Sequence, residues 1–259
     1  MSQLTHATSD DTVVAVNAAG TSSVVLVCEH ASRHIPASFD GLGLSDAARK
    51  SHAAWDPGAM GVSEILATRL DARLVASGVS RLVYDCNRPP SSPDAMPALS
   101  EVVEVPGNTG LSDEDRRARV DMFYRPFEAK LRQVLDDVVD PIVITIHSFT
   151  PVYHGVFRPV EIGVLHDSDA RLADAMLKVA AKHTNANVRR NAPYGPEHGV
   201  THTLQEHAIP KGRLNVMLEV RNDLIETAAQ QDAMATLLAG WIANACAELG
   251  RERDVQCRA

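Results

Sequence analysis

The chain has 259 residues, of which 45% are hydrophobic, 22% charged and only 4% aromatic. This length suits one large α/β domain or two small ones, and it allows a sizeable core. Lys and Arg number 25 against 33 Asp and Glu, and the formal charge of -8 argues against a protein that binds nucleic acids or anionic membranes. No apolar run approaches the ~18 residues of a membrane helix, and no signal peptide is recognisable, so we expect a soluble, cytoplasmic protein.

The four cysteines lie far apart, and no two of them form a Cys-x-x-Cys pair. This spacing favours reduced packing thiols over a structural zinc knot or a disulfide framework. The thiols in question are Cys28, Cys86, Cys246 and Cys257.

The order of predicted elements indicates an α/β fold. Residues 1–20 are polar and without a sustained period, which predicts a flexible arm before a single catalytic domain at 21–259. Continuous apolar runs predict buried strands at Val24–Cys28, Arg81–Asp85, Pro141–His147, Glu161–His166 and Arg213–Arg221. Helical patterns lie at Ala59–Leu70, Asp113–Val139 (opened by a Ser112–Asp115 capping box), Ser168–His183 and about Glu226–Leu249. This alternation predicts a mostly parallel, mixed sheet with helices on both faces.

Two long segments lack a helical or strand pattern. Asn87–Gly110 holds most of the clustered prolines and directly follows a predicted strand, which favours an ordered functional loop. Asn191–Lys211 is a second such segment and a candidate lid. Its histidines, His198, His202 and His207, are expected to make contacts within the lid.

Reactive side chains are concentrated where the predicted strands end, which is where open α/β sheets bind ligands. They are Glu29 and His30, Asp85, Asn87 and Arg88, His147 and Ser148, Glu219 and Arg221, together with Asp56 in a Trp-Asp-Pro-Gly turn. Two histidines and a carboxylate that meet at one edge make a zinc site with its fourth position open to water. A further carboxylate can act as general base, and arginine or asparagine can hold a substrate carboxylate.

Several of these segments occur in the order seen in a known family. They are CEHAS (Cys28–Ser32), the Trp55-Asp56 turn, YDCNRPP (Tyr84–Pro90), ITIHSFTP (Ile144–Pro151) and VMLEVRND (Val216–Asp223). In these segments the chain, from about Val24 to Ala245, resembles the N-formylglutamate amidohydrolases, distant relatives of the zinc carboxypeptidases and aspartoacylases. The resemblance implies a carboxypeptidase-like fold, one zinc ion and an enzyme of histidine degradation. Its substrate would be a small acidic N-acyl amino acid, N-formyl-L-glutamate, hydrolysed to formate and glutamate.

The resemblance also implies a ligand set. His30 and His147 correspond to metal ligands, and Asp56 is the preferred third ligand, with Glu29 as the alternative. A helix cap is the competing role for Asp56. The carboxypeptidases take a glutamate ligand three residues after the first histidine, but that position here is Arg33, which cannot coordinate a cation.

The remaining roles follow the same resemblance. Glu219 corresponds to the general base, which later acts as acid. Asn87 and Arg88 resemble the segment that grips the substrate carboxylate beside the metal. Arg221 lies two residues after Glu219, so it shares that face of the strand and could bind a second carboxylate or pair with Glu219 or Asp223. Arg158 is either an oxyanion or substrate contact or an exposed loop cation.

One departure bears on the substrate. The better-known members carry Pro-His-Ser-Gly around the first histidine, whereas this chain has Glu29-His30-Ala31-Ser32. The difference leaves open another N-acyl amino acid or a small peptide as substrate. Arg33 leaves open a carboxylate-binding module without metal. The oligomeric state cannot be predicted from these residues.

Overall fold

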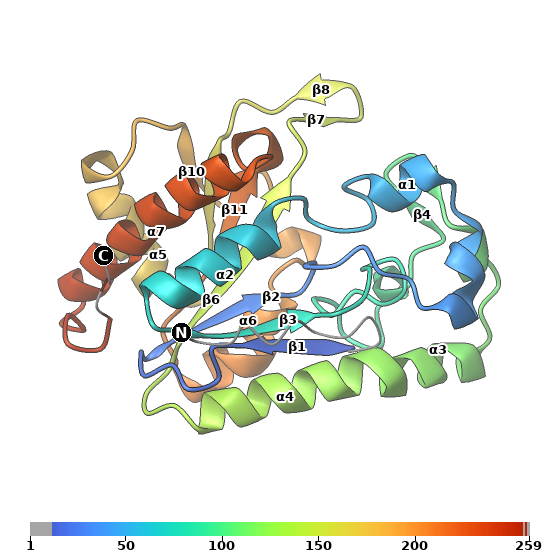
Figure 1. Cartoon of the computed structure of the whole chain (residues 1–259), viewed down its shortest axis with the longest axis horizontal. Helices are drawn as coiled ribbons and strands as arrows, with labels where there is room; N and C mark the ends of the chain where they lie inside the picture. The colour runs from blue at the N-terminus through green and yellow to red at the C-terminus, as the bar shows by residue number, and fades with distance from the viewer. Residues whose placement is uncertain (1–11, 256, 258–259) are drawn as a thin grey trace.

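The computed structural model describes residues 12–255 and residue 257. They form one α/β domain around a seven-stranded sheet with the strand order β1-β3-β2-β6-β11-β9-β10 (Figure 1). The strands are β1 (Val13–Val16), β2 (Val24–Cys28), β3 (Arg73–Ser77), β6 (Ile142–Phe149), β9 (Ile162–Leu165), β10 (Val188–Arg190) and β11 (Asn215–Arg221). The helices are α1 (Asp46–Lys50), α2 (Ala59–Arg69), α3 (Asp113–Arg119), α4 (Arg125–Asp136), α5 (Arg171–Val179), α6 (His202–His207) and α7 (Ala228–Glu248).

The sheet is mostly parallel and mixed, as predicted. Strand β2 pairs in parallel with β3 and β6, β6 pairs in parallel with β11, and β10 pairs in parallel with β9. The pairs β1–β3 and β9–β11 are antiparallel. The parallel strands β2, β6 and β11 therefore end at one edge of the sheet, where their polar residues can meet.

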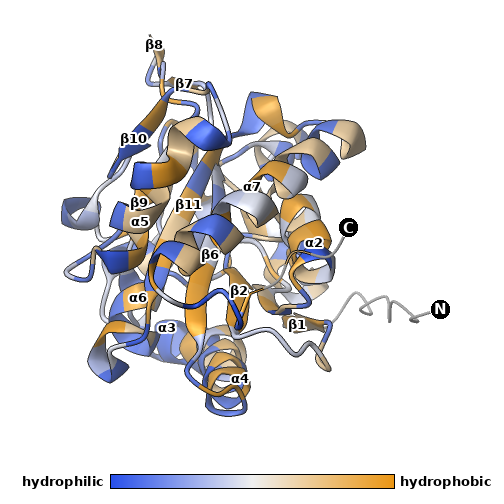
Figure 2. Ribbon diagram, turned by 90° about the vertical axis from the view of Figure 1, so that its left-hand side faces the viewer, coloured by the Kyte–Doolittle hydropathy of each residue, from blue (hydrophilic) through white to orange (hydrophobic). Residues whose placement is uncertain are grey.

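Helices cover both faces of the sheet, which explains the continuous apolar runs of its central strands. Every residue of β2, β6 and β11 is buried. On one face α2, α5 and α7 enclose a core that includes the buried Trp241, and on the other face α4 packs with Phe127 and Leu131 against the sheet. Figure 2 shows the hydrophobic β6 between these two layers.

The predicted strand Arg81–Asp85 was wrong. These residues form turns, and the strand beside β2 is β3. The two segments begin alike, RLVAS in β3 and RLVYD at residues 81–85, and both bury their apolar side chains. Burial alone does not separate a strand from a buried turn, so the apolar run was misleading here.

The predicted N-terminal arm at residues 1–20 was wrong in part. Strand β1 lies within this range and pairs with β3 as an edge strand, so the sheet begins before residue 21. Residues 1–11 of the predicted arm lie outside the described residues. Strand β10 was not predicted either, because three residues are too few to show a period.

The helices lie close to their predicted positions. The predicted helix at 113–139 is α3 and α4 joined by a π-helical turn at Val120–Tyr124, and its capping box between Ser112 and Asp115 is confirmed. Cys28, Cys86 and Cys246 are buried free thiols, as predicted. Among the described residues, no helix combines the length and hydrophobicity that crossing a bilayer requires.

The two long segments contain short elements. Residues 87–110 include the hairpin β4 (Leu99–Ser100) with β5 (Val103–Glu104), and a second hairpin, β7 (Val152–Tyr153) with β8 (Val156–Phe157), follows β6. Residues 191–211 include α6. Their role as lids stays a prediction.

Candidate active site

Two strand ends and one turn position the proposed metal ligands. His30 follows β2, His147 lies in β6, and Asp56 lies in the turn before α2. The backbone N–H of Asp56 donates to the carbonyl of His30 at 2.9 Å. Gly58 in this turn has a φ of 82°, and a Cβ there would lie 2.3 Å from the carbonyl oxygen of Ile225. The turn therefore needs glycine to bring Asp56 against the sheet edge.

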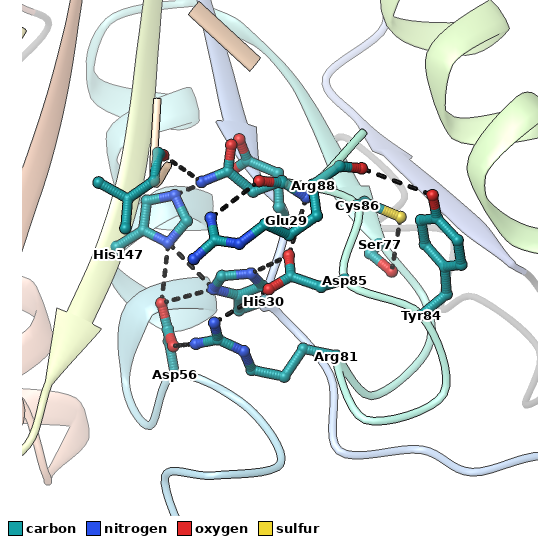
Figure 3. A network of polar contacts seen from close by, with 12 residues as sticks. Glu29, His30, Asp56, Ser77, Arg81, Tyr84, Asp85, Cys86, Arg88 and His147 are labelled. Carbon is teal, nitrogen blue, oxygen red and sulfur yellow. Dashed lines mark hydrogen bonds and ion pairs between the residues drawn. The ribbon is translucent and has the colours of Figure 1, made fainter. Parts of the chain in front are cut away.

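The three side chains form a compact buried cluster (Figure 3). Nδ1 of His147 lies 3.2 Å from Nδ1 of His30 and 2.9 Å from Oδ2 of Asp56, and Nδ1 of His30 lies 3.3 Å from the same oxygen. The two nitrogens are thus closer than twice a Zn–N bond of about 2.1 Å. The predicted convergence of His30, Asp56 and His147 is confirmed, and their ligand atoms all lie within 4.8 Å of one another.

The carboxylate of Asp56 faces this cluster and does not cap a helix. The first turn of α2 has no side-chain cap, and Oδ2 of Asp56 accepts a hydrogen bond from the N–H of Ser148 at 3.2 Å. Burial favours the neutral carboxyl, but the charge of His30 and the hydrogen bond from His147 outweigh it and hold the pKa of Asp56 well below its usual range. An ionised carboxylate is the form that binds a cation.

Each imidazole contacts a second carboxylate through its other nitrogen. Nε2 of His30 lies 2.7 Å from Oδ1 of Asp85, and Nε2 of His147 lies 3.1 Å from Oε2 of Glu29. Glu29 is fully buried and lies on the far side of His147 from Asp56, so the alternative that Glu29 completes the ligand set is not supported by the geometry. Both histidines present Nδ1 to the cluster and Nε2 to an acid.

Glu219 lies beside the cluster. It is the register partner of His147 on the neighbouring parallel strand, and the two side chains therefore share one face of the sheet. Among the described residues, Oε2 of Glu219 has no hydrogen-bond partner. Burial raises the pKa of Glu219 to about 7. A carboxyl that titrates near neutrality can both accept and return a proton.

These residues line one cavity of about 180 Å³. Its charged lining groups are Asp56, Arg81, Arg88, Glu101 and Glu219. The other lining residues are His30, His52, Ala53, Asn87, Ser100, His147, Ser148, Phe149, Thr150, Tyr153, Tyr194 and Val200. This volume fits a small molecule about the size of a substituted amino acid.

The family model described as N-formylglutamate amidohydrolase matches residues 22–226. The chain belongs to this family. Membership makes it a hydrolase that acts on an amide bond. No match was found among the curated proteins.

Two solved structures have a fold similar to that of this chain. Gene product Atu2144 from Agrobacterium tumefaciens is 50% identical over 93% of this chain and 97% of that chain, with a TM-score of 0.91. The N-formylglutamate amidohydrolase from Ralstonia eutropha JMP134 is 17% identical over 90% of this chain and 94% of its own, with a TM-score of 0.59, a likeness in fold alone.

The amidohydrolase site differs from the sequence predictions in its arginines. Arg81 was missed because its segment was assigned to a strand. Its guanidinium lies 3.0 Å from Oδ2 of Asp85 and 3.5 Å from Oδ1 of Asp56, so it joins the carboxylate of the candidate ligand Asp56 to the acid that contacts His30. The separation of four residues between Arg81 and Asp85 was the one feature of the sequence that could have indicated this ion pair.

Asn87 and Arg88 line the cavity, but their contacts differ. The side chain of Asn87 donates to the carbonyl of Val200 at 2.5 Å and accepts from the N–H of Thr203 at 3.0 Å, so it ties the 191–211 segment to the site. The guanidinium of Arg88 donates to the carbonyls of Gly199 and Asn87 at 2.6 and 3.1 Å. Among the described residues, no carboxylate pairs with Arg88.

Arg221 and Arg158 are not among the residues that line the cavity. Nε of Arg221 donates to Oδ1 of Asp223 at 2.8 Å, which is one of the pairings expected for it. Arg158 donates to the Tyr194 hydroxyl at 2.9 Å and lies 4.2 Å from the centre of the Tyr153 ring. It is therefore packed behind two tyrosines of the cavity wall.

Three further histidines make contacts that the sequence analysis did not predict. His52 lines the cavity and lies 2.6 Å from Oε2 of Glu101. His202 and His207 of α6 are buried, and Nε2 of His202 contacts the Tyr124 hydroxyl at 2.8 Å. The pairing of His52 with Glu101 joins residues far apart in the chain, which the pattern around either residue does not reveal.

Proposed function

We propose that the chain is a zinc-dependent amidohydrolase that cleaves the formyl amide of N-formyl-L-glutamate, or the amide of a related N-acyl amino acid. The products would be formate, or the corresponding acid, and the free amino acid. The observation that carries the proposal is a buried carboxyl oxygen without a hydrogen-bond partner, Oε2 of Glu219, beside the cluster of His30, Asp56 and His147.

The donor set fits zinc. Two imidazole nitrogens and one carboxylate oxygen are ligands that catalytic zinc sites use, with a position left for water or substrate. His30, His147 and Asp56 would hold the ion. When bound, zinc polarises the amide carbonyl and makes water a better nucleophile at neutral pH. The acids on the far nitrogens, Asp85 and Glu29, would orient the two imidazoles.

Glu219 would act as general base and then as general acid. It accepts a proton from the water that attacks the formyl carbon, and it returns this proton to the leaving nitrogen. Its place beside His147 puts it within the same cavity as the ligands. A pKa of about 7 suits both steps, because neither the charged nor the neutral form is strongly disfavoured.

Arg88 would bind the substrate carboxylate. Its charge is not matched by a carboxylate of the described residues, and a guanidinium binds carboxylate through two parallel hydrogen bonds. Asn87 would support this contact through the 191–211 segment that it anchors. Arg158 and Arg221 do not line the cavity. We propose that they influence substrate binding only indirectly, by holding residues of the cavity wall in place.

Release of formate by the purified, zinc-loaded protein tests the proposal. N-formyl-L-glutamate, N-acetyl- and N-succinyl-L-glutamate and a small peptide should be compared, with formate or free amine as the readout. Hydrolysis of an N-acyl amino acid supports the proposal, and preference among the acyl groups identifies the leaving acid. Absence of turnover on all of them would contradict it.

Metal analysis separates the enzyme from a carboxylate-binding module of the same fold. Growth in zinc-replete medium should give close to one zinc per chain. Less than about one tenth of an equivalent, in protein that remains folded, would favour the binding module, since ligand sets of this kind retain their ion during purification.

A further inference from the structure

One tyrosine of the cavity wall is held in place by an arginine that does not line the cavity. The hydroxyl of the lining residue Tyr194 accepts a hydrogen bond of 2.9 Å from Nη1 of Arg158. The same guanidinium lies 4.9 Å from the centre of the Tyr194 ring and 4.2 Å from that of Tyr153. The carbonyl of Arg158 in turn accepts a hydrogen bond of 3.2 Å from Nη1 of Arg221. The Tyr194 hydroxyl is therefore fixed from behind the cavity wall.

The chain just before Tyr194 lies on the face of the sheet that carries Glu219. Gly163 of β9 is the register partner of Glu219 on β11, and the side chains of directly opposed residues share one face. A Cβ at Gly163 would lie 2.1 Å from the carbonyl oxygen of Ala192, two residues before Tyr194. The glycine thus leaves room beside Glu219 for this segment, and the sheet itself brings Tyr194 towards the proposed base.

The electrostatics of the hydroxyl agree with this placement. Burial raises the pKa of Tyr194 above its ordinary value, and the charge of Glu219 acts in the same direction. The charges of Arg158 and Arg81 act against this shift without cancelling it. Glu219 and Arg81 also line the cavity. The phenol therefore keeps its proton at neutral pH and lies within electrostatic range of both groups.

The Tyr194 hydroxyl has a proton to donate into the cavity. A guanidinium only donates hydrogen bonds, so the contact with Arg158 uses a lone pair of the phenol oxygen and leaves its O–H group available. In the part of the chain that the structure describes, this contact is the one hydrogen bond of the hydroxyl. A hydroxyl that accepts from a cation is also a better donor, because linked hydrogen bonds polarise one another. A substrate bound beside Glu219 would supply the acceptor.

We propose that Tyr194 is a further catalytic residue, which donates a hydrogen bond to the carbonyl oxygen of the reacting amide, and that Arg158 is the positioning residue that holds its hydroxyl. The inference rests on the proposed amidohydrolase function and adds these two roles to it. The carbonyl oxygen gains negative charge as water attacks, so this hydrogen bond is stronger in the transition state than in the substrate complex. The phenol keeps its proton throughout, and Glu219 carries out the proton transfers.

Tyr194→Phe tests the catalytic role, because it removes the hydroxyl and keeps the ring beside Arg158. With the N-acyl amino acid that the wild type hydrolyses fastest, we expect kcat to fall roughly 10- to 100-fold and KM to change less than about 3-fold. Tyr124→Phe is the matched control, since the Tyr124 hydroxyl contacts Nε2 of His202 at 2.8 Å but does not line the cavity. Its kcat should equal that of the wild type. An unchanged kcat in Tyr194→Phe, with or without a rise in KM, would overturn the inference.

A double-mutant cycle tests the positioning role. Arg158→Met keeps an unbranched side chain beside the rings and removes the donor, so it should lower kcat roughly 3- to 10-fold in the wild-type background. In Tyr194→Phe it should change kcat little, because no hydroxyl is left to hold. An equal loss in both backgrounds would overturn the positioning role of Arg158, and the kcat of Tyr194→Phe is decisive by itself if Arg158→Met does not fold. A wild type that hydrolyses no N-acyl amino acid would instead contradict the proposed function, on which the inference depends.

Discussion

Oε2 of Glu29 lies 3.1 Å from Nε2 of His147, although the two residues are separated by more than a hundred positions in the chain. In the proposed site, a carboxylate near this nitrogen would favour a proton there and would leave Nδ1 to bind the metal ion. Asp85 stands in the same relation to His30.

The first prediction concerns metal affinity. In the proposed site, the charge of Glu29 orients the His147 imidazole and makes it more basic. Replacing Glu29 by Gln removes this charge, and we therefore expect zinc affinity to fall roughly 10- to 100-fold. Competition with a chromophoric chelator measures this directly, without an activity assay. Glu219→Gln serves as the control, because Glu219 is buried beside the cluster but is not placed as a ligand. Equal zinc affinity in Glu29→Gln and the wild type would contradict the role of Glu29.

The second prediction concerns proton transfer. Glu219→Gln should keep zinc bound and the fold intact, and its kcat should fall by at least about 100-fold because no other lining carboxyl group is free to accept the proton. The melting temperature should not fall, since the substitution removes a buried carboxyl group whose Oε2 has no hydrogen-bond partner among the described residues. Near-normal turnover in this variant would rule out Glu219 as the base.

The central strands and the ligand cluster could be predicted because local patterns carry the information. Strands β2, β6 and β11 are buried on both faces and appear as unbroken apolar runs, so a polar residue at their ends, such as His30 or Glu219, is conspicuous. Parallel pairing then brings these ends together, which is a property of the sheet and not of any one segment.

The contacts that surround the cluster could not be predicted in this way. Arg81 reaches Asp56 from a turn that the apolar pattern presents as a strand, and Glu101 meets His154 and His52 across three separate loops. The predicted roles of Arg158 and Arg221 depended on the direction of long side chains, which residue spacing does not determine. Edge strands such as β1 are short and half exposed, so they leave only a weak pattern.

The third prediction concerns substrate binding. Arg88→Lys keeps the positive charge but loses the planar fork that binds a carboxylate, and it cannot reproduce the contacts to the carbonyls of Gly199 and Asn87. We expect KM to rise about 10-fold or more, with a smaller change in kcat, since a bidentate pair contributes a few kcal/mol at most to binding. Steady-state kinetics with the best N-formyl substrate gives both values. Arg189→Lys, on the exposed part of β10, is the control and should leave KM unchanged.

The last prediction concerns stability in acid. Burial lowers the pKa of His207 from 6.5 to about 4, because α6 places the imidazole where its charged form is poorly solvated. The unfolded chain takes up this proton near pH 6.5, whereas the folded chain does not until about pH 4. The contribution of His207 is therefore complete above pH 6.5 and is lost as the pH falls towards 4. It amounts to about 3 kcal/mol of unfolding free energy at its full extent.

Urea unfolding of the wild type and of His207→Gln at pH 7.5 and pH 5 tests whether His207 makes the unfolding free energy fall as the pH falls. The variant should lose less unfolding free energy than the wild type between the two values, by about 1–2 kcal/mol, because the pH interval covers only part of the titration. His198→Gln is the matched control, since the His198 side chain is 53% exposed and its removal should leave the difference between the two pH values unchanged. An equal loss in His207→Gln and the wild type would show that the imidazole is protonated in the fold or is not buried in solution.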